Sequence, residues 1–191
     1  MPDVEHLKQD LGYVRGLVGK TEADATPPGV YLLWALLIPV GFALTDLAPN
    51  RVGLYWLLAA PAGFLLSTYL GARASRQRGQ VEHREGTRHV LHWAGMIGAL
   101  ALTVPLSATG ALSANGTAQV MLLLLALSFF LAGVHLSPPL LWVGLLMAAG
   151  YLLTFFVTGH VWTTVGLVVS LALLLSALLA RRRERAQATP A

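Results

Sequence analysis

Apolar runs dominate the chain from residue 30 onward. Six of them predict membrane spans: 30–47, 52–72, 89–106, 118–134, 140–158 and 161–180. Such a span needs about 20 apolar residues to cross roughly 30 Å of hydrocarbon. Pro138 and Pro139 separate the fourth run from the fifth, and Gly159 and His160 separate the fifth from the sixth, since proline disfavours helix at the residue before it. We therefore predict an all-α, polytopic membrane bundle of six transmembrane helices. Five spans, with one break being a kink, is the alternative.

A different pattern precedes the first span. Apolar residues recur three and four positions apart, which places them on one face of a helix: Val4, Leu7, Leu11, Val14 and Val18. The pattern predicts an N-terminal amphipathic helix that ends before a linker containing Pro27 and Pro28. Two heptads are too short for a stable isolated helix, so this helix should rest on a protein partner, on the bundle's own loops or on the membrane surface. The predicted organisation is thus 1–29 (helix and linker), 30–180 (six spans) and 181–191 (basic tail).

Charge supports a membrane class. Residues 89–180 include no Asp, Glu, Lys or Arg, and only 12% of the whole chain is charged, against about 25% in soluble domains. Ionisable groups near a span centre are typical of ion-coupled transporters, and none is predicted here. No P-loop, dinucleotide-binding or hydrolase motif is present, and the absence of cysteine excludes thiol catalysis. We predict no catalytic residue and no cofactor.

The basic residues lie on one side of the predicted spans. Twelve of the 13 fall in the N-terminal segment, between spans two and three, or in the tail; the exception is Arg51. Because positive residues stay in the cytoplasm, both termini are predicted to be cytoplasmic, and the arginines are expected to meet lipid headgroups rather than nucleic acid. The abundance of Ala, Leu, Gly and Arg is typical of GC-rich bacterial genomes. The predicted location is therefore a bacterial inner membrane.

Small residues four apart favour close helix packing, because lipid is as apolar as leucine and association depends on close backbone contact. Three spans carry such ridges: Ala59, Gly63, Ser67 and Gly71 in the second, Ala94 and Gly98 in the third, and Gly144 and Ala148 in the fifth. They serve either packing within the bundle or a homo-oligomer interface. Pro39, Pro61 and Pro105 are expected to kink their spans.

The densest set of ligand-type residues lies before and within the third span. Glu85, His89 and His92 are spaced four and three apart, on one helical face. His135 is predicted at the same side of the membrane. Together the four residues predict a divalent metal site, such as one for zinc. The alternatives are histidines that hydrogen-bond carbonyls or headgroups, and a haem held between His92 and His135.

A second polar set is predicted at the opposite side. It comprises Asp46, Arg51, Thr154, Thr158, His160, Thr163 and Thr164. These residues form either a polar vestibule or, as is common, partners for helix ends and for hydrogen bonds between helices.

These patterns favour an accessory or scaffold subunit that contacts a partner through its N-terminal helix. A channel or carrier for a small neutral or apolar solute is the rival hypothesis, and a metal- or haem-binding redox protein is the third. The oligomeric state is left open.

Overall fold

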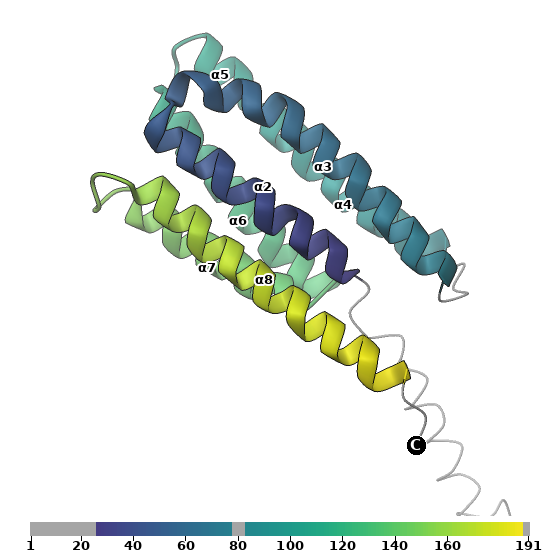
Figure 1. Ribbon diagram of the computed structural model, residues 1–191. Helices are drawn as coiled ribbons and strands as arrows, with labels where there is room; N and C mark the ends of the chain where they lie inside the picture. The colour runs from purple at the N-terminus through teal and green to yellow at the C-terminus, as the bar shows by residue number, and fades with distance from the viewer. Residues whose placement is uncertain (1–25, 78–82, 189–191) are drawn as a thin grey trace, which may run out of the picture.

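The computed structural model describes residues 26–77 and 83–188, and that part of the chain folds into helices without a strand (Figure 1). The helices are α2 (Pro28–Leu47), α3 (Pro49–Gln77), α4 (His83–Ala101), α5 (Val104–Ala108), α6 (Ala114–His135), α7 (Pro139–Leu153) and α8 (Val161–Ala188). The predicted N-terminal amphipathic helix lies outside the described residues.

Five helical segments are long and apolar enough to cross a membrane: α2, α3, α4 continued by α5, α6 and α8. The helical membrane bundle predicted from the sequence is therefore confirmed. The fifth predicted span, 140–158, differs in length, because α7 has 15 residues and so rises only about 22 Å. Beyond it, the Phe155 and Phe156 N–H groups donate to carbonyls three residues back, a tighter turn than α-helix. Gly159, with φ of 97°, then redirects the chain into α8.

Proline decides where several helices begin and end. α7 starts at Pro139, and α4 ends at Ala101 shortly before α5, whose second residue is Pro105, since proline fits the first turn of a helix but cannot donate a hydrogen bond within it. Pro39 and Pro61, by contrast, lie inside α2 and α3, which continue through them. The predicted break at Pro138 and Pro139 is thus present, and the span in which Pro105 was expected to cause a kink is interrupted between Ala101 and Val104.

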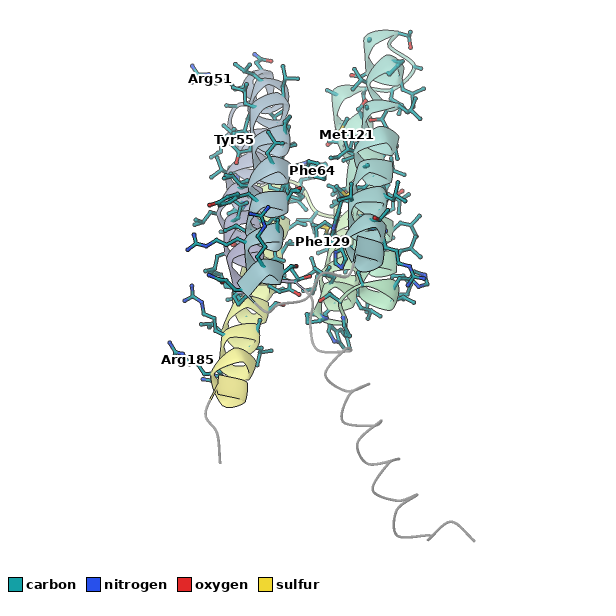
Figure 2. The ribbon with its side chains drawn as sticks, turned by 90° about the vertical axis from the view of Figure 1, so that its right-hand side faces the viewer. Arg51, Tyr55, Phe64, Met121, Phe129 and Arg185 are labelled. Atoms are coloured by element: carbon teal, nitrogen blue, oxygen red, sulfur yellow. The ribbon has the colours of Figure 1, made fainter. Side chains whose placement is uncertain are left out.

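Neighbouring helices follow the order α3, α2, α8, α7, α6, α4 within the described residues, and α5 also touches α6. Figure 2 shows two groups, with α2, α3 and α8 on one side and α4 to α7 on the other. Contact between α7 and α8 joins the groups. The helices at the two ends of this order, α3 and α4, have few fully buried residues: 6% of the apolar stretch of each is buried, against 44% in α8.

The core lies mainly between α2 and α8 and between α6 and α7. The Ser170 hydroxyl of α8 donates to the Ala35 carbonyl of α2 at 2.6 Å. The hydroxyl groups of Tyr31 and Ser137 lie 2.9 Å apart and are both buried, which ties α2 to the connection between α6 and α7. Polar contacts of this kind fix the register of helices whose apolar surfaces alone are interchangeable with lipid.

Small residues let neighbouring helices pack closely in two of the three spans where the sequence predicted it, against the backbone of α6 at Gly144 and against side chains of α2 at Gly63. A Cβ added at Gly144 would lie 2.7 Å from Phe130 Cα of α6, and one at Gly63 would lie 3.0 Å from Leu37 Cδ1 of α2. These two glycines therefore pack inside the bundle, whereas a Cβ at Gly71, the last member of the α3 ridge, would meet nothing within 4 Å. A Cβ at Gly98 of α4 would meet nothing within 4 Å, and Ala94 is exposed, so neither residue is buried against a helix of the described chain.

Candidate functional site

His92 of α4 lies where this helix meets α6. His89 and His92 are both half-buried, and the His92 Nε2–H donates to the Ser128 carbonyl of α6 at 3.0 Å. The His92 ring is edge-on to Trp93, with centroids 5.0 Å apart, and Trp93 is edge-on to Phe129 of α6 at 5.2 Å. One hydrogen bond and a run of aromatic contacts thus hold α4 against α6.

This hydrogen bond limits what His92 can ligate. A carbonyl oxygen only accepts, so Nε2 carries the proton in the contact with Ser128. A protonated imidazole nitrogen has no lone pair for a metal, which leaves only Nδ1 of His92 as a donor atom. The geometry matches the alternative in which a histidine hydrogen-bonds a carbonyl, although the carbonyl belongs to a neighbouring helix.

His135 lies apart from this contact. It is the last residue of α6 and is exposed. It follows Ser128 by seven residues, which corresponds to about 10 Å along the helix. Among the described residues, no three His, Cys, Asp or Glu side chains are grouped closely enough for a metal. Glu85 belongs to the first turn of α4 and its side chain is outside the description, so the four-residue metal site and the haem alternative stay predictions.

At the opposite end of the bundle, Asp46 binds the start of α8. One carboxylate oxygen, Oδ2, accepts from both the Thr163 N–H and the Thr163 hydroxyl, each at 2.7 Å. Thr163 is the third residue of α8, where helical N–H groups have no intrahelical acceptor. Asp46 of α2 therefore caps a helix that begins more than 100 residues later, and its negative charge faces the positive end of the helix dipole.

Other polar residues at this end of the bundle also form hydrogen bonds at helix ends or between helices. The Gln119 amide of α6 donates to the Thr154 hydroxyl at 3.0 Å, and the Thr154 hydroxyl donates to the Tyr151 carbonyl at 2.7 Å. The Thr164 hydroxyl donates to the His160 carbonyl. These contacts match the prediction that such groups satisfy helix ends and link helices.

A depression of about 260 Å³ lies at the connection between α7 and α8. Its lining is mostly apolar and comprises Leu153, Val157, Thr158, His160, Val161, Thr164 and Val165. The lining residues come from one end of two adjacent helices, so this is a surface hollow and not a passage through the bundle.

In the described part of the chain, every buried side-chain nitrogen or oxygen has a hydrogen-bond partner. No unsatisfied polar atom therefore marks a ligand site there. No family model, curated protein or solved structure matches this chain. The fold defines the class, a helical membrane protein.

Proposed function

We propose that this chain is an accessory or scaffold subunit of a membrane complex, and that α4, with α3 beside it in sequence, packs against a partner helix in the bilayer. The observation that supports this proposal is the low burial of α3 and α4. Each packs against one main neighbour, α2 and α6 respectively, and only 6% of the apolar stretch of each is buried within the described chain.

The uncovered face of α4 has the composition of a helix contact. Ala94, Gly95 and Gly98 are exposed, and a Cβ added at either glycine would meet nothing within 4 Å. Small residues let two helix backbones approach in lipid, whereas a surface that meets only acyl chains gains nothing from them. A partner helix is the occupant that such a face suits.

The proposal places the chain in a bacterial inner membrane with both termini in the cytoplasm. The positive-inside rule supports this orientation. In the proposed orientation the N-terminal segment, predicted to be an amphipathic helix, is available to a cytoplasmic partner.

Site-specific photo-crosslinking in native membranes tests the proposal. A photoreactive residue at Gly98 should yield a discrete protein product, which mass spectrometry identifies as a different protein or as a second copy. The matched control carries the same residue at Val40 of α2, which is also exposed and should yield only lipid adducts. Lipid adducts alone at both positions would refute the proposal.

No specific contact among the described residues supports the rival hypothesis of a solute channel. The hollow at the connection of α7 and α8 is confined to that end. Flux measurements with reconstituted protein over a panel of neutral solutes remain its direct test.

A further inference from the structure

Positive charge is concentrated at the end of the bundle where α2 begins and where α3 and α8 end. Residues 73–88 and 181–185 include nine arginines and three glutamates. Within residues 26–77 and 86–182 the only acidic residue is Asp46, which binds Thr163 at the opposite end. Figure 2 shows Arg185 at the arginine-rich end and Arg51 at the other.

Two of these arginines lie on α3 just beyond the start of α2. A Cβ added at Gly29, the second residue of α2, would lie 3.5 Å from Leu70 Cδ1 of α3, so these residues share a level. Arg73 follows Leu70 by about one turn and Arg76 by nearly two, which places them about 4.5 and 9 Å beyond that level. Both side chains are exposed.

Two more arginines reach the same level from α8. Ser170 of α8 bonds the Ala35 carbonyl of α2, and the two helices run in opposite directions. Arg181 follows Ser170 by 11 residues, about three turns, so it returns to the side of α8 that faces α2. Arg181 lies roughly 16 Å from the level of Ala35 along the bundle axis. Pro28 lies about 10 Å from the level of Ala35 in the same direction. Arg181 and its exposed neighbour Arg182 therefore lie about 6–8 Å beyond the start of α2, at about the level of Arg76, with α2 between α3 and α8.

An exposed apolar surface continues from these arginines along the bundle. On α2, which packs against both α3 and α8, Leu36 is 69% and Val40 is 48% exposed. Leu66 of α3 and Leu178 of α8 are exposed as well. Arginines from two helices thus border a surface suited to hydrocarbon chains.

We propose that an anionic phospholipid binds this face, with its phosphate held between Arg73 and Arg76 of α3 and Arg181 and Arg182 of α8, and with its acyl chains along Leu36 and Val40 of α2. Guanidinium groups form charge-assisted hydrogen bonds with phosphate oxygens. The adjoining apolar surface favours a lipid over a free phosphate ion. The site is separate from the proposed partner face on α4.

Native mass spectrometry of the detergent-purified full chain tests the site. The probe is phosphatidylglycerol, compared with phosphatidylcholine carrying the same acyl chains. Each arginine near a membrane surface contributes about 1 kcal/mol toward an anionic lipid, so Arg73→Gln combined with Arg181→Gln should weaken phosphatidylglycerol binding about 30-fold. Binding of phosphatidylcholine should stay unchanged.

The control pair is Arg51→Gln with Arg88→Gln, which removes the same total charge from α3 and α4 outside the site. It should weaken binding by less than about threefold. Equal losses in both pairs would overturn the proposal in favour of diffuse charge attraction. Displacement of the lipid by millimolar inorganic phosphate would overturn it in favour of a free-anion site. Thermal unfolding of each variant confirms that the fold is intact.

Discussion

Close contact between α6 and α7 at Gly144 can be tested by adding one methyl group. The Cβ of Gly144→Ala would lie 2.7 Å from Phe130 Cα and 2.8 Å from the Ala126 carbonyl oxygen. Both are backbone atoms of α6, so neither can rotate away. The Phe130 backbone nitrogen would be closer still, so the two helices must separate by at least about 0.8 Å locally to reach ordinary contacts of about 3.5 Å.

The magnitude follows from the contacts that such a shift loosens. A gap of 0.5–1 Å removes a quarter to a half of each van der Waals attraction. For roughly 40 atom pairs at about 0.15 kcal/mol each, the loss is about 2 kcal/mol, in the range found for overpacked cores. Alanine also favours helix over glycine by up to about 1 kcal/mol, so the control must carry the same gain.

Gly98→Ala provides that control, because the added methyl group would meet nothing within 4 Å. Thermal unfolding in mild detergent, followed by tryptophan fluorescence, should place the Tm of Gly144→Ala about 4–8 °C below that of Gly98→Ala. Equal Tm values would show that α6 and α7 do not approach as closely as described, and the reasoning from backbone contact would be wrong.

Three further predictions concern the polar contacts. Asp46→Ala should lower the free energy of unfolding by about 1–2 kcal/mol, because it removes the cap and charge at the start of α8; combined with Thr163→Ala, the losses should be less than additive in a double-mutant cycle, and full additivity would contradict the contact. Ser170→Ala should lower the free energy of unfolding, measured with denaturant, by only about 0.6 kcal/mol. The Ala35 carbonyl keeps its own helical partner, and hydrogen bonds between membrane helices are weak. The last prediction concerns zinc in protein that is purified without an affinity tag, refilled with zinc and desalted. Elemental analysis should find less than about a tenth of an ion per chain, because His92 donates through Nε2. About one ion per chain, lost in His92→Ala, would instead establish the metal site.

The breaks on either side of α7 could be read from the sequence because they depend on local chemistry, whereas α3, α4 and α8 begin or end several residues outside the predicted spans 52–72, 89–106 and 161–180. Consecutive prolines end a helix wherever they stand, and Gly159 permits the positive φ that the turn before α8 requires. The length of α7 could not be read in this manner. Residues 154–158 are as apolar as a helix interior requires, yet Thr154 bonds the Tyr151 carbonyl and the chain tightens into a turn.

The candidate sites were predictable only in part. The pattern placed His89 and His92 on one face of a helix, and His92 bonds the Ser128 carbonyl of α6. It did not indicate that Ser128 would supply the acceptor. Any accessible carbonyl oxygen with a free second lone pair could accept this hydrogen bond. Asp46 carried a stronger signal: it is the only acid within residues 26–81, and a lone carboxylate at the end of a span requires a partner. Its partner, Thr163, lies too far along the chain for spacing to reveal.

Helix order was the property least accessible from the sequence, for a physical reason. In a soluble protein the apolar stripe of a helix points to the core, but in lipid an apolar side chain is equally stable against acyl chains or another helix. Leu36 and Ile38 of α2 are both large aliphatic residues, yet Leu36 is largely exposed and Ile38 is buried. What distinguishes the buried side is the small and polar residues: Ser170 meets α2, and Gly166 of α8 lies where a Cβ would be 3.0 Å from Phe42 Cγ. Exposed small residues are therefore the informative exception, and those of α4 are the strongest reason to expect a further helix beside this bundle.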